Sequence, residues 1–168
     1  LATVKSLSFF GLIVGAPDVV VAWAVLVFVH VVMAGVLAHL LALRLQVPGA
    51  GAWLAGLAYQ WAPVQLSGLH NGSTEAVGAG WLAAAVLGLL WAVDSRDDQA
   101  RHHVVTRCLL TGVLGALCTI ANWYAGGCFG IFLVGLGLYR RRRATVLRLI
   151  GVFIVLAGVV LPVALKVH

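Results

Sequence analysis

The sequence is poor in charged residues, and above all in acidic ones. Only 10% of its 168 residues are charged, and five acidic residues stand against eleven lysines and arginines. Soluble domains carry roughly a quarter charged residues, whereas 62% of this chain is hydrophobic and its mean hydropathy is +1.07. The shortage of charge excludes an ordinary soluble domain and predicts an integral membrane protein.

Signatures of soluble enzymes and of metal sites are missing as well. The chain contains no Walker A loop and no GxGxxG, HExxH or GxSxG pattern, so chemistry that uses nucleoside triphosphates or a soluble nucleophile elbow has no support. Cys108, Cys118 and Cys128 are ten residues apart and fit no metal-ligand spacing. We therefore expect them to pack as small hydrophobic residues, with no metal site and no evident cofactor.

The apolar runs predict helices. Several reach or approach the roughly 20 residues that cross a bilayer, and they lack the period-2 alternation of strands. We expect an all-α, polytopic transmembrane helix bundle forming a single domain over residues 1–168. Because the chain opens on Leu1 and stops at His168 directly after an apolar run, we expect a fragment of a longer membrane protein. About six spans are expected, over residues 19–43, 50–66, 75–93, 104–120, 125–139 and 146–165.

Positive charge gathers in the connections between these expected spans. With six alternating spans, nine of the eleven lysines and arginines fall on one side, and the positive-inside rule assigns that side to the cytoplasm. The distribution indicates membrane topology and membrane lipid contact, with no nucleic-acid partner. The outer side then carries Asp18, residues 70–75 and residues 122–124.

A polar cluster directly precedes the third expected span. Glu75 falls in the first helical turn, where free N–H groups and the helix dipole favour a carboxylate, and Asn71, Ser73 or Thr74 can act as the N-cap. Cap chemistry is therefore one interpretation. The other is that His70, Asn71 and Glu75 bind a polar substrate group at the membrane boundary. A sugar hydroxyl suits Glu75 better than a phosphate oxygen, because two anionic groups repel each other.

Asn122, Trp123 and Tyr124 interrupt the apolar pattern between two later spans. Tryptophan and tyrosine are common in the aromatic belt at a membrane surface, because most of each side chain is apolar while its N–H or O–H group can hydrogen-bond to water. Aromatic faces also stack on the C–H faces of sugars, and a neighbouring amide can orient hydroxyl groups. Both interpretations place these residues at the outer boundary.

A few polar side chains fall inside the expected spans. His30 and His39 are nine residues apart, which places them on opposite faces of an ideal helix. We expect each to hydrogen-bond a neighbouring helix. The alternative is that His30, His39, Gln60 and Gln65 mark the path of a transporter or flippase subunit.

The order of three segments resembles a known family. These are LAHLLALRLQVPGAGAWLAGLAYQWAP, then SGLHNGSTEAVGAGWL, then, after a mixed-charge loop, GVLGALCTIANWYAGGCFGIFLVG. Over residues 7–139 this order is similar to bacterial membrane proteins related to the GT-C superfamily of polyprenyl-phosphate-sugar-dependent glycosyltransferases. The segment at Trp81 lacks a proline that such relatives carry.

The resemblance implies a bacterial inner (cytoplasmic) membrane enzyme that transfers a sugar from a lipid-phosphate carrier to an acceptor at the outer face. It implies that the lipid-linked sugar is the donor substrate and that the substrate-binding residues are His70, Asn71, Glu75, Asn122, Trp123 and Tyr124. The acidic base of such enzymes usually lies in the first outer loop, after the first span. We expect that loop to precede this chain, so the catalytic base is not assigned, and Glu75 and Asp18 are stand-in candidates within the sequence.

A third interpretation is a non-catalytic assembly subunit. Gly126 and Gly130 have the GxxxG spacing that allows helices to approach closely. Such a subunit would form a stable hetero-complex and would be insensitive to substitutions of the polar residues named above.

Overall fold

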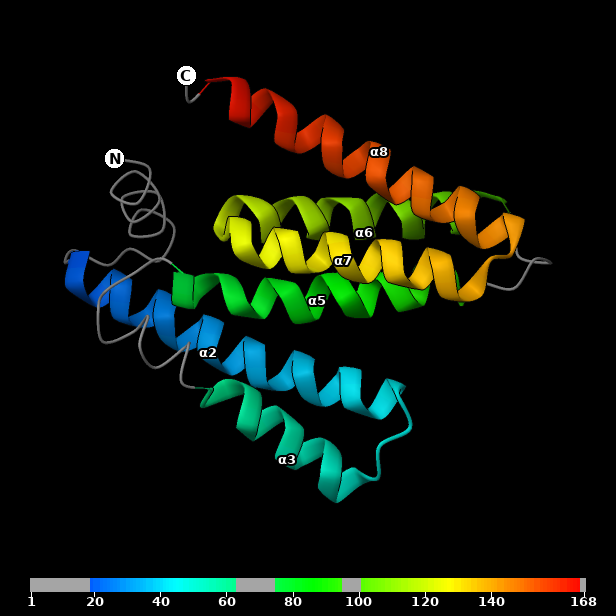
Figure 1. Cartoon of the computed structure of the whole chain (residues 1–168). Helices are drawn as coiled ribbons and strands as arrows, with labels where there is room; N and C mark the ends of the chain where they lie inside the picture. Colours follow the sequence, from blue (N-terminus) through cyan, green and yellow to red (C-terminus); the bar gives the residue numbers. More distant parts are fainter. Residues whose placement is uncertain (1–18, 63–74, 95–100, 167–168) are drawn as a thin grey trace.

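The computed structural model describes residues 19–62, 75–94 and 101–166 (Figure 1). Every element within these ranges is a helix, so the all-α prediction is confirmed for them. The helices are α2 (Val19–Arg44), α3 (Gly49–Gln60), α5 (Glu75–Val93), α6 (Arg101–Ala121), α7 (Trp123–Arg140) and α8 (Arg143–Lys166).

The helices end where the sequence offers a break. After α2, Gln46 takes a left-handed backbone conformation with φ of 63°, and Pro48 precedes the first residue of α3. Asn122, with an extended backbone, separates α6 from α7. The left-handed residue Arg141, with φ of 35°, ends α7 before α8 begins.

Successive helices run in opposite directions and form layers (Figure 1). The central helix α5 packs against α2 on one side and against α6 and α7 on the other. One outer layer is α3, which covers α2, and the other is α8, which packs mainly on α6. The buried residues of α8, Thr145, Leu149 and Val152, all lie in its first half, and the second half diverges from the bundle (Figure 1).

Three segments of the described chain are long and apolar enough to cross a membrane. They are Ala24–Arg44 within α2, the whole of α6 and the whole of α8. Helix α3 has 12 residues and is about 18 Å long, which is short of the roughly 30 Å of hydrocarbon in a bilayer. The structure therefore supports a membrane protein, and the prediction of about six spans is met only in part.

A buried hydrogen bond joins the two central helices α5 and α6. The Thr111 hydroxyl donates to the carbonyl oxygen of Gly88 at 2.9 Å, and Thr111 is fully buried. A Cβ atom at Gly88 would lie 3.2 Å from the Thr111 oxygen, so the glycine lets the two helices approach closely. Small residues combined with interhelical hydrogen bonds are a common basis of helix association in membranes.

Two glycines of α6 serve the same purpose toward the later helices. A Cβ atom at Gly112 would lie 2.5 Å from Cβ of Val155 on α8, and one at Gly115 would lie 2.5 Å from the ring of Phe129 on α7. Phe129 is fully buried by this contact and is one of the largest core side chains. The absence of a side chain at these two positions therefore sets the distance from α6 to both α7 and α8.

We predict that Gly112→Ala destabilises the bundle, because the added methyl group overlaps Val155 and the backbone of α8. Overpacking of this kind typically costs about 1–3 kcal/mol. Thermal unfolding in detergent micelles measures the change. The matched control is Gly158→Ala on α8, where an added Cβ meets no atom within 4 Å among the described residues. The control should leave the stability unchanged or raise it, and equal losses in both variants would contradict this account of the α6–α8 contact.

Candidate functional site

Only part of the predicted outer group falls within the described chain. Asp18, His70 and Asn71 lie outside the described residues. Glu75 is the first residue of α5, and the structure describes its backbone but not its side chain. The structure therefore describes the side chains of three predicted site residues: Asn122, Trp123 and Tyr124.

The Asn122 side chain caps α7. Its Oδ1 atom accepts hydrogen bonds from the backbone N–H groups of Tyr124 at 2.9 Å and Ala125 at 3.2 Å. Asparagine directly before an apolar helix is a common N-cap signal, but we predicted caps only in the polar cluster that precedes α5. The Asn122 oxygen thus holds the first turn of α7, which carries Trp123 and Tyr124, in place.

Trp123 and Tyr124 form an exposed aromatic pair. Their ring centroids are 4.1 Å apart, and the rings are inclined by 33°. The residues are 68% and 59% exposed, so aromatic surface remains accessible on both. A membrane-interface belt and a sugar-stacking platform both require such exposure, and the geometry is compatible with either.

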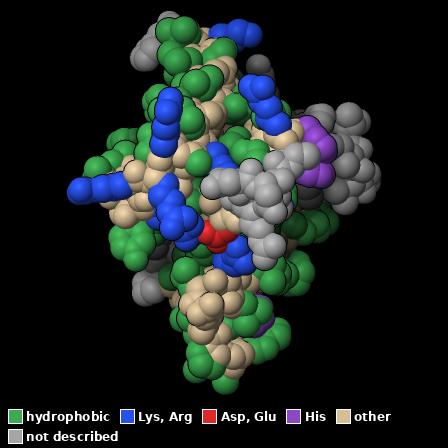
Figure 2. All heavy atoms as spheres, turned by 90° about the vertical axis from the view of Figure 1, so that its right-hand side faces the viewer, with side chains coloured by type: hydrophobic (Ala, Val, Ile, Leu, Met, Phe, Trp, Pro, Cys, Tyr) green, Lys and Arg blue, Asp and Glu red, His purple; other side chains and the backbone are tan. Residues whose placement is uncertain are grey.

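All described arginines lie at the opposite end of the bundle from this pair. Arg101 begins α6, whose other end at Ala121 is about 30 Å away along the helix axis. Figure 2 views the arginine end and shows blue side chains gathered around an acidic one. The described arginines therefore gather at one end of the molecule, as the sequence predicted.

Asp94 organises this arginine end. Its two carboxylate oxygens each accept one bond of 2.7 Å, one from Arg44 at the end of α2 and one from Arg140 at the end of α7. Arg148 of α8 adds a bond of 3.1 Å to the carbonyl oxygen of Val93. The ends of α2, α7 and α8 therefore meet the end of α5, an arrangement that no motif in the sequence predicts.

A small cavity lies between α2 and α3. A Cβ atom at Gly56 would lie 2.7 Å from the carbonyl oxygen of Gly35, so the two glycines let the helices touch. The cavity beside this contact has a volume of about 170 Å³ and is lined in part by His39, Trp53 and Gln60. The rings of His39 and Trp53 lie 4.5 Å apart, and the buried Nδ1 atom of His39 has no hydrogen-bond partner among the described residues.

Helix α3 ends beside the middle of α2. Gln60, its last residue, lies against Gly35, where a Cβ would be 2.8 Å from the Gln60 Oε1 atom. Gly35 is nine residues before Arg44, which corresponds to about 13 Å along α2. The end of a short helix and two polar side chains, His39 and Gln60, are thus placed between otherwise apolar helices, where polar groups are costly and often functional.

The expectation that both histidines bond to a neighbouring helix is wrong for His30. Its Nδ1 atom donates to the carbonyl oxygen of Leu26 in its own helix at 2.8 Å, and its ring meets Trp81 of α5 edge-on. His39 makes a ring contact with α3 in place of the expected bond. The separation of the two histidines in the sequence does not predict these contacts, because a histidine side chain can also bond to the carbonyl group four residues earlier in its own helix. Gln65 lies outside the described residues.

The cysteine and GxxxG predictions are each met in part. Cys108 and Cys118 are buried as expected, whereas Cys128 is exposed on α7. Gly126 packs against Thr119 of α6, but an added Cβ at Gly130 meets no described atom within 4 Å. Within the described ranges no three His, Cys, Asp or Glu side chains come together as a metal site would require.

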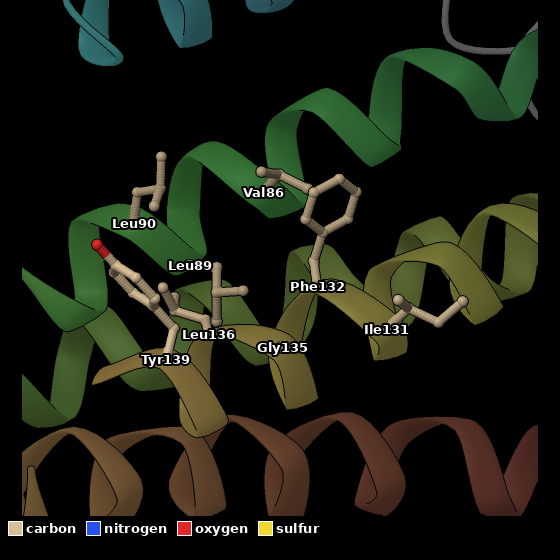
Figure 3. A pocket seen from close by; sticks show the side chains of 8 residues that line it. All are labelled: Val86, Leu89, Leu90, Ile131, Phe132, Gly135, Leu136 and Tyr139. Atoms are coloured by element: carbon tan, nitrogen blue, oxygen red, sulfur yellow. The ribbon is translucent and has the colours of Figure 1, made fainter. Parts of the chain in front are cut away.

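An apolar groove runs along α5 beside α7. One section, of about 360 Å³, is lined by residues that include Leu89, Gly135 and Tyr139 (Figure 3). A second section, of about 300 Å³, extends toward α2 and α3. We call the two sections together the side groove, because both are lined by Val86, Leu90 and Phe132.

We predict that His39→Phe does not destabilise the protein. The phenyl ring keeps the contact with Trp53 and removes a buried nitrogen whose missing hydrogen bond costs about 1–3 kcal/mol. His30→Phe is the control, because it deletes the bond to Leu26 and should lower stability by about 1 kcal/mol. Thermal unfolding in detergent compares the two. A larger loss for His39→Phe than for His30→Phe would show that His39 has a partner.

The chain matches no protein-family model, no curated protein and no solved structure.

Proposed function

We propose that this chain is the membrane-embedded part of a glycosyltransferase of the bacterial inner membrane. It takes a sugar from a polyprenyl-phosphate carrier and transfers it to an acceptor at the outer membrane face. The proposal draws on the resemblance to the GT-C superfamily. The structural observation that carries it is the exposed Trp123–Tyr124 pair at the end of the bundle opposite every described arginine.

The distribution of arginines indicates which end of the bundle faces outward. Positively charged residues next to membrane spans are enriched on the cytoplasmic side. With the arginine end in the cytoplasm, the aromatic pair lies at the outer boundary, about 30 Å away along α6. An acceptor glycan and the head of a lipid-linked sugar meet at that boundary.

The Trp123–Tyr124 pair offers a surface for sugar binding. Two exposed rings offer apolar faces against which the C–H face of a sugar ring can stack. The Asn122 cap fixes the first turn of α7, so the pair is presented by a rigid helix end. A preorganised aromatic surface lowers the entropy cost of binding.

The reaction also needs a general base near the aromatic pair. Glu75 begins α5, and α5 ends at the arginine end, so the backbone of Glu75 lies at the same end as Trp123. In the proposed reaction a carboxylate, from Glu75 or Asp18, removes the proton of the acceptor hydroxyl. The acceptor oxygen then forms a bond to the anomeric carbon with inversion, while the bond to the carrier phosphate breaks and the phosphate leaves with the electron pair.

A transfer assay in proteoliposomes with a polyprenyl-phosphate sugar tests this reaction in the full-length protein. Glu75→Gln or Asp18→Asn, whichever removes the base, should lower kcat by about 10²–10⁴-fold. Trp123→Ala and Tyr124→Ala should raise KM for the donor or acceptor. Phe153→Ala, which removes an exposed aromatic ring from α8, is the control and should leave transfer unchanged. Unimpaired transfer in both carboxylate variants, and in variants of any further outer acidic residues, would contradict the proposal.

A transporter or flippase subunit is the second candidate function, and the cavity between α2 and α3 favours it. His39 and Gln60 face this cavity, and α3 ends beside it. Polar side chains at the end of a short helix inside the membrane are typical of substrate paths.

Labelling of single cysteines distinguishes the two functions. With Cys108, Cys118 and Cys128 replaced by Ala, a cysteine is placed at Gln60 or at His39. For a glycosyltransferase we expect membrane-impermeant thiol reagents to reach these positions from the outer side at most. Labelling from both sides of the membrane would instead support transport, because alternating access exposes one site to each side in turn.

A further inference from the structure

The side groove has the lining of a hydrocarbon-binding site. Its two sections, of about 360 and 300 Å³, are of the size of small-molecule pockets. Aliphatic and aromatic side chains line it, and Tyr59 and Tyr139 contribute its only side-chain hydroxyls among the described residues. A polar ligand finds few partners there, whereas an alkyl chain gains dispersion contacts along the whole length.

One face of α5 connects this groove to the arginine end. Leu82, Val86, Leu90 and Asp94 follow each other at intervals of four residues, so each lies about one turn further along and about 40° around the axis from the one before. The first three line the groove. The fourth is the carboxylate that holds Arg44 and Arg140. Leu90 on the floor of the groove is therefore one turn away from Asp94, whose backbone N–H donates to the Leu90 carbonyl oxygen at 2.9 Å.

The groove walls end at the same arginines. Tyr139 of α7 is the residue before Arg140, and Leu45 is the residue after Arg44. Each wall thus ends one residue away from an arginine in the chain. The side chains of Arg44 and Arg140 are 48% and 38% exposed, so their pairing with Asp94 leaves part of each accessible.

The charge at this end is suited to an anion. Among the described residues, one carboxylate, Asp94, balances only one of its two arginine partners, and residues 141–143 add three more arginines next to Arg140 in the chain. A guanidinium group binds phosphate through a planar pair of N–H donors. Basic pockets between helices on the cytoplasmic side of a membrane bind anionic lipid headgroups for this reason.

We propose that the side groove holds an acyl chain of an anionic phospholipid and that Arg44 and Arg140 bind its phosphate. The lipid contacts α2, α5 and α7 at once, so it stays bound when bulk lipid exchanges. The two arginines that bind the phosphate are at the opposite end of the bundle from the proposed sugar-transfer residues, and the site does not depend on that function.

Native mass spectrometry of the full chain in detergent tests the site with two lipids of identical acyl chains, phosphatidylglycerol and phosphatidylcholine. We expect phosphatidylglycerol to be retained on the order of tenfold better, since each arginine near an anionic headgroup adds to binding. The double variant Arg44→Gln/Arg140→Gln should remove this preference. Its control, Arg142→Gln/Arg143→Gln, changes the net charge equally and should keep most of it. Equal losses in both double variants would overturn the proposal, because they would indicate general attraction to the basic end.

A second variant tests the groove without touching Asp94 or its partners. Gly135 lines the groove and has no described atom within 4 Å of an added Cβ, so Gly135→Leu fills the space that the acyl chain would occupy. We expect it to abolish retention of both lipids, while Gly158→Leu on α8, which is also in open space, keeps it. Thermal unfolding confirms that both variants are folded. Retained phosphatidylglycerol in a folded Gly135→Leu variant would place the lipid elsewhere and overturn the proposal.

Discussion

A backbone surrounded by hydrocarbon must satisfy its hydrogen bonds internally, and this constraint underlies the rest of the structure. It accounts for helices throughout the described chain. Since lipid is as apolar as the side chains, burial of apolar surface gives little reason for these helices to associate. Close approach at small residues, such as Gly88, Gly112 and Gly115, supplies the dispersion contacts that hold them together.

The same constraint governs the polar groups. The Thr111 hydroxyl and the His30 ring each bond to a backbone carbonyl, and Asp94 is placed at the end of its helix between two arginines. Exposed ion pairs contribute at most about 1 kcal/mol each. The importance of Asp94 is therefore geometric, because it aligns the ends of α2, α5 and α7. His39 is the exception to the pattern, and it lines a cavity together with a tryptophan and a glutamine.

Charge and aromatic surface divide the molecule into two ends with different chemistry. The arginine end offers guanidinium groups next to an apolar groove, which suits a phospholipid. The other end offers the Trp123–Tyr124 pair and the start of α5, which suits the head of a lipid-linked sugar. The proposed functions use both ends of one bundle. The short helix α3 starts near the arginine end and ends beside the middle of α2, where a transport path would lie.

The sequence by itself determined the helical class, the membrane environment and the gathering of the arginines on one side, because these depend on composition and on local order along the chain. It did not determine which helices touch. The helices are apolar on nearly every face, so no amphipathic pattern indicates their neighbours. The pairing of Asp94 with Arg44 and Arg140 joins residues 50 and 46 positions apart, and the side groove requires four helices together. Only tertiary packing decided these features, because they arise from contacts between segments that are distant in the chain.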